Sequence, residues 1–170
     1  MISFSAIAEI VIEGPQAAVF EYIVPIDLTL IFTGYGPLPA VIGVENQTGS
    51  WNGAGQTRTV ILSDGSTARE LLSRYDHPQY FSYTVSNFSG VLRFLTISAN
   101  GEWWFETSQH PHSTFVKWSY TFNSRSAIVA PVLWLITNFL WQGYMNKALK
   151  LCKRQIENKN AQQQFAPDRG

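Results

Sequence analysis

The C-terminal part of the chain, Ser126–Asn158, has the hydrophobic pattern of one long helix. Apolar side chains recur there at steps of three and four residues, the period of a buried helical stripe. This stripe consists of Leu133, Ile136, Leu140, Tyr144, Ala148, Leu151 and Cys152. Pro131 falls in the first turns, where a missing N–H costs little, and Ser124 and Ser126 are candidate N-caps. We therefore expect this helix to cover a sheet formed by the preceding chain.

The first half of this helix is apolar on more than one side. No charged residue occurs from Ser126 to Asn146, and Trp134 and Trp141 lie seven residues apart, so we expect them to share a face. A helix that is apolar nearly all round is normally buried on several sides or spans a membrane. Pro131 and the polar residues inside this one argue against a span. Two interpretations stay open: a second wall of a cavity, or a contact surface through Trp134 and Trp141 for a homodimer or a membrane.

The chain before the helix alternates between apolar and polar positions, as half-buried strands do. The first strand is Ile2–Glu13, followed by short helices at Pro15–Val24 and Ile26–Phe32 and a loop at Thr33–Ala40. Six more strands are predicted at Val41–Gln47, Gln56–Leu62, Thr67–Tyr75, Gln79–Val85, Arg93–Thr107 and Ser113–Asn123. Short turns join them, so we expect an α+β domain with a curved antiparallel sheet wrapped around the long helix. The domain spans 1–158, and residues 159–170, with their Gln run and Pro167, are expected to be disordered.

The last two predicted strands carry most of the candidate binding residues. Pairing them about the turn at Gln109–His112 places Trp103 opposite Trp118 and Tyr120 opposite Gly101. The inward face of this pair then holds Trp103, Phe105, Trp118, Tyr120 and Phe122. Opposite them, the helix offers Leu133, Ile136, Leu140 and Tyr144. These nine side chains either fill the core or line a cavity for an apolar ligand.

Arg58 and Glu70 flank a hairpin signal at Asp64-Gly65. A two-residue turn would place the two charges on opposite faces of the hairpin. A three-residue turn with a bulge would pair Arg58 with Glu70 directly. An inward pair could polarise a ligand carbonyl or move a proton with Tyr120, whereas an outward pair would be a surface ion pair of little energetic weight. The sequence leaves both open.

Composition narrows the function classes. Twelve basic and twelve acidic residues give a net charge of zero, which argues against nucleic acid as a partner. His77, His110 and His112 have no cluster of further ligands around them, so we expect no metal site and no cofactor. The single Cys152 and the lack of a signal-peptide pattern at the N-terminus favour a cytoplasmic protein.

The order of elements and several local phrases resemble the START-like superfamily, also called SRPBCC or birch-pollen-allergen-like, and within it the bacterial polyketide cyclase/dehydrase group. The phrases are Gly14-Pro15 with Val19-Phe20, then Gly55–Arg58, Asp64-Gly65, Glu70 and Val116-Lys117-Trp118, and the resemblance extends from Ser3 to Glu157. It implies a helix-grip fold with a deep apolar cavity between sheet and helix.

The resemblance implies binding, and in some members transport, of a hydrophobic small molecule such as a lipid or a polyketide. It leaves enzyme and carrier open, because the superfamily hosts both. The first interpretation is a cofactor-free carrier or binding protein. The alternatives are a cyclase/dehydrase-type enzyme that uses Arg58, Glu70 and Tyr120, and an interaction module that acts through the apolar helix.

Overall fold

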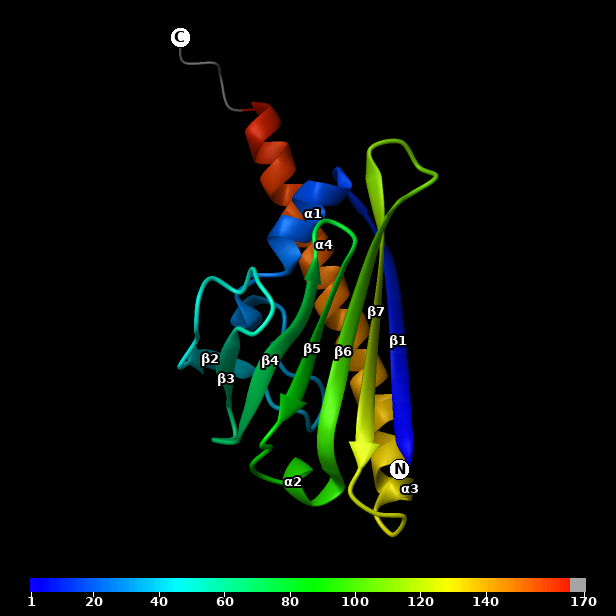
Figure 1. Cartoon of the computed structure of the whole chain (residues 1–170). Coiled ribbons are helices and arrows are strands. Elements are labelled where there is room, and N and C mark those ends of the chain that lie inside the picture. Colours follow the sequence, from blue (N-terminus) through cyan, green and yellow to red (C-terminus); the bar gives the residue numbers. More distant parts are fainter. Residues whose placement is uncertain (166–170) are drawn as a thin grey trace.

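The computed structural model of the protein describes residues 1–165 and confirms the predicted α+β helix-grip fold (Figure 1). The strands are β1 (Ser3–Glu13), β2 (Val41–Glu45), β3 (Thr57–Leu62), β4 (Thr67–Asp76), β5 (Tyr80–Ser86), β6 (Thr96–Thr107) and β7 (Ser113–Ser124). The helical segments are α1 (Gln16–Ile23), the 3₁₀ turn η1 (Leu28–Leu30), α2 (Leu92–Leu95), α3 (Ala130–Leu135), the π-helix η2 (Ile136–Trp141) and α4 (Gln142–Phe165).

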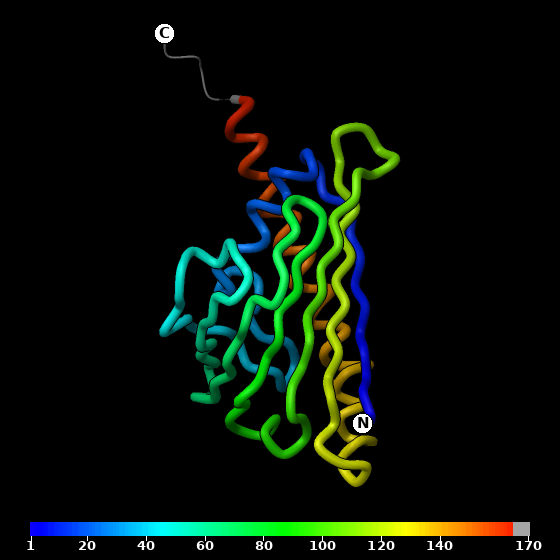
Figure 2. Tube along the Cα trace, in the orientation of Figure 1, coloured from blue at the N-terminus to red at the C-terminus, as the bar shows by residue number. Residues whose placement is uncertain are grey.

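The seven strands form one antiparallel sheet in the order β1-β7-β6-β5-β4-β3-β2. Strands β2 to β7 are sequential neighbours, and β1 closes the far side of β7. The predicted register of the last two strands is confirmed, with Trp103 opposite Trp118 and Gly101 opposite Tyr120. The sheet curves around the C-terminal helix, which runs along its concave side (Figures 1 and 2).

Side chains of α4 cover the free edge of β1. Gln142 accepts a hydrogen bond from the Ile7 N–H (3.2 Å) and donates one to the Ile7 carbonyl (2.7 Å). Further along, the Lys153 ammonium donates to the Val11 carbonyl at 2.8 Å. Unpaired backbone groups on an edge strand are a template for pairing with other chains. The helix therefore closes the sheet on this side as well as covering it.

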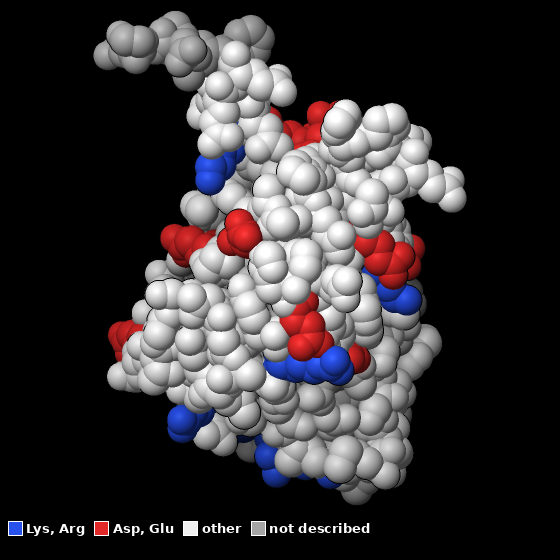
Figure 3. Space-filling model, turned by 45° about the horizontal axis from the view of Figure 1, so that its top comes forward, with Lys and Arg blue, Asp and Glu red and all other residues white. Residues whose placement is uncertain are grey.

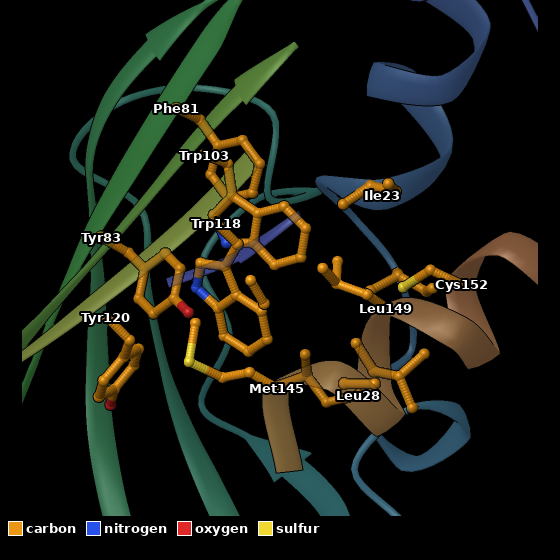
Figure 4. Packing of buried hydrophobic residues seen from close by; sticks show 14 of the residues in the cluster. Ile23, Leu28, Phe81, Tyr83, Trp103, Trp118, Tyr120, Met145, Leu149 and Cys152 are labelled. Carbon is orange, nitrogen blue, oxygen red and sulfur yellow. The ribbon is translucent and has the colours of Figure 1, made fainter. Parts of the chain in front are cut away.

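The core lies between the concave face and α4. Strands β6 and β7 bury every second side chain, and Trp103 stacks on Trp118 with ring centroids 4.6 Å apart. Met145 and Leu149 of α4 point toward these rings (Figure 4). Side chains therefore fill the space between α4 and this part of the sheet.

The predicted long helix is present but is not uniform. Pro131 lies in the first turn of α3, as expected, but the N-cap is Val129 without a side-chain hydrogen bond. The prediction of a Ser124 or Ser126 cap is therefore wrong; the Ser124 hydroxyl instead donates to the Ser126 carbonyl at 2.9 Å.

The π-helix η2 corrects a second expectation. Each π turn holds one residue more than an α turn, and one residue corresponds to about 100° of rotation. Trp134 and Trp141, seven residues apart, therefore do not share a face. Trp134 is 44% exposed, whereas Trp141 points inward against Tyr120, with ring centroids 4.7 Å apart.

Two segment boundaries also differ from the prediction. Residues 92–95 form α2 in place of the start of a long strand. Helix α4 continues to Phe165, which corrects the expectation of disorder for 159–165, while 166–170 lie outside the described residues. Within residues 1–165, no helix is both long and apolar enough to cross a membrane.

Candidate functional site: a cavity between the sheet and the C-terminal helix

A cavity of about 330 Å³ lies between the β2–β5 side of the sheet and the η2 region of the helix. Its walls come from four places: the η1 segment with the loop after it, strands β2 to β5, the connection before α2, and the helix with two residues of β7. The main lining residues are Leu28, Phe32, Pro37, Leu38, Pro39, Val41, Val60, Ala68, Glu70, Val85, Phe88, Val91, Leu92, Tyr120, Phe122, Ile136, Leu140, Trp141 and Tyr144. The volume is at the lower end of the range of small-molecule sites, about 300–1,000 Å³.

The π-helix forms one wall of this cavity. Ile136, Leu140 and Trp141 all belong to η2 and all line it. The buried Thr137 hydroxyl donates to the Leu133 carbonyl at 2.8 Å and so satisfies a backbone acceptor at the start of the π turn. π-Bulges are often found at functional sites, and here the extra residue turns the Trp141 ring inward.

A second wall is the loop 33–40, which α4 holds in place. The Tyr144 hydroxyl accepts from the Gly34 N–H (2.9 Å) and donates to the Pro39 carbonyl (2.8 Å). Lys147 donates to the Gly34 carbonyl at 2.8 Å. The Tyr35 ring lies where a side chain at Gly143 would be, because a Cβ there would meet the ring at 2.3 Å. These contacts fix the loop as a wall of the cavity.

Arg58 and Glu70 form a buried ion pair on the concave face. The Leu62 N–H donates to the Ser66 carbonyl at 2.9 Å, which leaves three residues, 63–65, in the turn between β3 and β4. Gly65 takes a positive φ of +80°, as a three-residue hairpin with a bulge requires. The two charged residues therefore pair directly across the strands. Arg58 Nε donates to Glu70 Oε2 at 2.7 Å, and the side chains are only 7% and 11% exposed. The Arg58 guanidinium also lies 4.0 Å from the centre of the Trp51 ring.

Two tyrosines stand near this ion pair. Tyr83 on β5 and Tyr120 on β7 are buried, with ring centroids 6.3 Å apart. Burial, and then the negative charge of Glu70, raises the pKa of Tyr83 above its ordinary value of 10.0. Burial also raises the pKa of Tyr120, with smaller contributions from Tyr83 and Glu70. Both phenols are thus neutral at physiological pH and can donate or accept hydrogen bonds.

Gly101 makes room for Tyr83. It lies between the two tyrosines in the sheet, opposite Tyr83 on β5 and Tyr120 on β7. A Cβ at this position would be 2.2 Å from Tyr83 Cζ and 2.5 Å from its hydroxyl. Glycine in a strand often marks such a close approach. In Figure 4 the Tyr83 hydroxyl points toward the indole nitrogen of Trp118.

The structure separates the nine predicted cavity residues into two groups. Tyr120, Phe122, Ile136, Leu140 and Tyr144 lie on the cavity wall. Trp103, Phe105, Trp118 and Leu133 lie instead in the filled core, which corrects their placement. The reason is the side-chain packing: the Phe20 and Phe105 ring centroids are 5.0 Å apart, the two tryptophans stack on each other, and Met145 and Leu149 of α4 point toward them (Figure 4). Any role of the first group in binding a ligand stays a prediction.

Some residues of the site had weak signals or none in the sequence. Trp51, expected in a turn, is buried against Arg58 with a φ of +56°, and no local pattern indicates this. Tyr83 could have been found from the alternation of Phe81, Tyr83 and Val85 along β5, all of which face inward.

The histidines and an open depression on the outer face of the sheet are weaker candidate sites than the cavity. His77 contacts Glu21 at 2.8 Å on the surface, and the described residues contain no group of three potential metal ligands. An open depression of about 650 Å³ lies on the outer face of the sheet, lined by Arg74, Tyr80, Glu102 and Trp104 among others. Because it is open to solvent, it excludes water poorly, and the inner cavity is the better candidate.

Comparisons with known proteins agree with this architecture. A family model described as polyketide cyclase/dehydrase and lipid transport matches residues 3–157. The sequence matches none of the curated proteins with which it was compared. Among solved structures, a norcoclaurine synthase variant from Thalictrum flavum bound to a transition-state analogue has a TM-score of 0.69 at 12% identity, over 94% of this chain and 97% of that one.

Two further structures are similar in the same way. The major latex-like protein 151 from Panax ginseng has a TM-score of 0.66 at 15% identity, covering 91% of this chain and 98% of that one. Ara h 8.0201 has a TM-score of 0.59 at 16% identity, covering 92% and 99%. At such identities the likeness shows the fold alone.

Proposed function

Because this chain belongs to the polyketide cyclase/dehydrase and lipid transport family, we propose that it binds a hydrophobic small molecule, such as a lipid or a polyketide, between its sheet and its C-terminal helix. The observation that carries the proposal is the cavity of about 330 Å³ with mostly apolar and aromatic walls. Apolar walls with a few polar groups are the usual design of a small-molecule site. Buried polar side chains on its wall include Glu70 and Tyr120.

The first test is native mass spectrometry of freshly purified protein, followed by solvent extraction. We expect a stoichiometric apolar compound to be released. In Ala68→Phe, a ring would fill the cavity next to β4, and the bound compound should be lost while the fold is kept. Ala161→Phe, on the exposed side of α4, is the matched control and should retain it. Retention of the compound by Ala68→Phe would place it elsewhere and contradict the proposal.

The same measurement bears on the enzyme alternative. If Arg58, Glu70 and Tyr120 act in acid–base catalysis, a ligand added back to the protein is recovered chemically changed. If the protein is a carrier, the ligand is recovered intact. Both ionic groups lie inside the fold and not in solvent, so the geometry is compatible with either outcome.

A second candidate function is exchange of this ligand with a membrane. An exposed apolar surface, here called the α2–α3 end, lies beside the cavity, whose wall includes Val91 and Ile136. It consists of Val91, Phe94, Ile128, Val132, Trp134, Leu135 and Phe139. The adjoining segments 87–101 and 124–146 contain Arg93 and Arg125 and no acidic residue. The lower end of the molecule in Figure 3 likewise shows basic but no acidic side chains. Apolar surface with positive charge is suited to an anionic bilayer.

A further inference from the structure

The buried ion pair leaves one carboxylate oxygen without a partner. Arg58 donates its Nε hydrogen to Glu70 Oε2, and Glu70 Oε1 accepts no hydrogen bond from any side chain or backbone group of residues 1–165. Glu70 lines the cavity, whereas Arg58 lies behind it against the Trp51 ring. The arginine therefore holds the carboxylate from one side and leaves its other oxygen for the cavity.

A second polar group shares this wall. Tyr120 lines the cavity, is only 5% exposed, and its hydroxyl forms no hydrogen bond with the described residues. The other charged lining residue, Asp64, is exposed in the β3–β4 turn, where it already accepts two hydrogen bonds from Ser66, at 2.9 and 2.6 Å. Glu70 and Tyr120 are thus inner polar groups of an otherwise mostly apolar and aromatic site, and the Trp141 indole N–H on the same cavity is a third group without a partner among the described residues.

From this arrangement we propose that the site selects apolar molecules that carry a hydrogen-bond donor, namely a hydroxyl, phenol or amine, and that this donor binds Glu70 Oε1 with the Tyr120 hydroxyl as the second contact. The inference rests on the proposed function. An ionised carboxylate only accepts hydrogen bonds. A ligand without a donor would cover this oxygen and leave it without a hydrogen bond. The free-energy penalty of such a buried, unsatisfied group is large enough to weaken binding strongly.

The same geometry excludes anionic ligands. A ligand carboxylate at this wall would meet Glu70, and two like charges in a site of low polarity repel strongly. Free fatty acids and other acids are therefore poor ligands, while the corresponding alcohols and amines are good ones.

The test compares three rigid probes of nearly equal shape by isothermal titration calorimetry: para-phenylphenol, its methyl ether and para-phenylbenzoate. We expect the phenol to bind about 10- to 100-fold more tightly than the ether, and the carboxylate to bind most weakly. Equal affinity of phenol and ether would overturn the donor selection while leaving cavity binding intact. Failure of all three to bind the folded protein would overturn the proposed function itself.

Variants of the ion pair sharpen the test. In Arg58→Met/Glu70→Leu, apolar side chains of similar volume replace the pair, which proteins often tolerate. This variant should still bind the ether and lose the preference for the phenol.

In Glu70→Gln, Arg58 has no carboxylate partner, so para-phenylbenzoate should bind at least tenfold more tightly than to the wild type. Tyr120→Phe should lower phenol affinity alone. An unchanged phenol-to-ether ratio in the double variant would overturn the assignment to Glu70.

Discussion

At the scale of single residues, the packing of Tyr83 beside Tyr120 depends on a glycine. Tyr83 lies on β5 and Tyr120 on β7. Strand β6 runs between them, and its Gly101 is the register partner of both tyrosines. Any side chain at this position would occupy the space of the Tyr83 ring. The absence of a Cβ at Gly101 thus leaves room for the Tyr83 ring on the concave side.

Gly101→Ala is expected to lower the free energy of unfolding by about 1–3 kcal/mol, the usual cost of overpacking. The added methyl group would meet Tyr83 Cζ at 2.2 Å and must displace the ring. Urea unfolding measures this change. The matched control is Gly43→Ala on β2, where a Cβ would have nothing within 4 Å. Equal stability of the two variants would show that Tyr83 does not occupy this position.

The Arg58–Glu70 pair shows how far the sequence could predict the placement of single residues. Both possible pairings of Arg58 and Glu70 followed from the Asp64-Gly65 signal, and they differed by one residue in the turn. The structure has the three-residue turn, so the two side chains share the inner face. Local propensity could not choose, because either turn suits these residues; the burial of the whole hairpin face selects the register.

At the scale of elements, the C-terminal helix has two functions in succession. Its second half, α4, fills the core and covers the edge of β1, and its first part forms a cavity wall on one side and the α2–α3 end on the other. The π-helix η2 separates the two roles of the tryptophans, with Trp134 outside and Trp141 inside. A hydrophobic period read from the sequence assumes a uniform helix and therefore placed both on one face.

Replacing the two tryptophans should have different consequences. Trp134→Ser should lower association with vesicles that contain anionic lipid by about tenfold, because one large apolar side chain is lost from the contact surface. Its unfolding free energy should stay within about 0.5 kcal/mol of the wild type. Trp141→Ser should instead cost about 3 kcal/mol, because an aromatic ring leaves the interior.

Vesicle co-sedimentation and urea unfolding measure the two effects. If Trp134→Ser associated with vesicles as the wild type does, membrane contact through this face would be excluded. If the wild type formed a dimer that Trp134→Ser dissolved, the α2–α3 end would be a contact between two copies of the chain.

At the scale of the whole molecule, burial of neutral acids links stability to pH. Burial raises the pKa of the Cys152 thiol from 9.0 to about 12, and it raises the pKa of Tyr83 and Tyr120 above 10.0. The unfolded chain therefore releases these protons at lower pH than the folded protein. Their contribution to stability is complete below the unfolded pKa values and is lost as the pH rises through the folded ones.

The free energy of unfolding should accordingly fall above about pH 9, by up to about 1.4 kcal/mol per pH unit for each group that is ionised only in the unfolded chain. Urea unfolding between pH 8 and pH 11 measures the slope. Cys152→Ala should fall less steeply from about pH 9 upward, since one such group is removed. Identical slopes for the variant and the wild type would mean that the thiol is not buried in the folded protein.

The sequence by itself determined the order of the strands, the antiparallel sheet, the inward face of β6 and β7, and the long helix that the sheet grips. These features follow from hydrophobic periods of two and of three to four residues, which are local properties of the chain. Only the tertiary structure decided where between the sheet and the helix the cavity lies. Trp103, Phe105 and Trp118 face inward as predicted, but α1 and α4 pack against them and fill that half of the grip.

The cavity lies in the other half, and its position depends on contacts between distant segments. Loop 33–40 bonds to α4, the π turn rotates Trp141 inward, and the hairpin turn places Glu70 opposite Arg58. The hydrophobic period of a sequence shows which side of a helix or strand faces the core. The elements that pack against that side decide whether its side chains are covered or line a cavity.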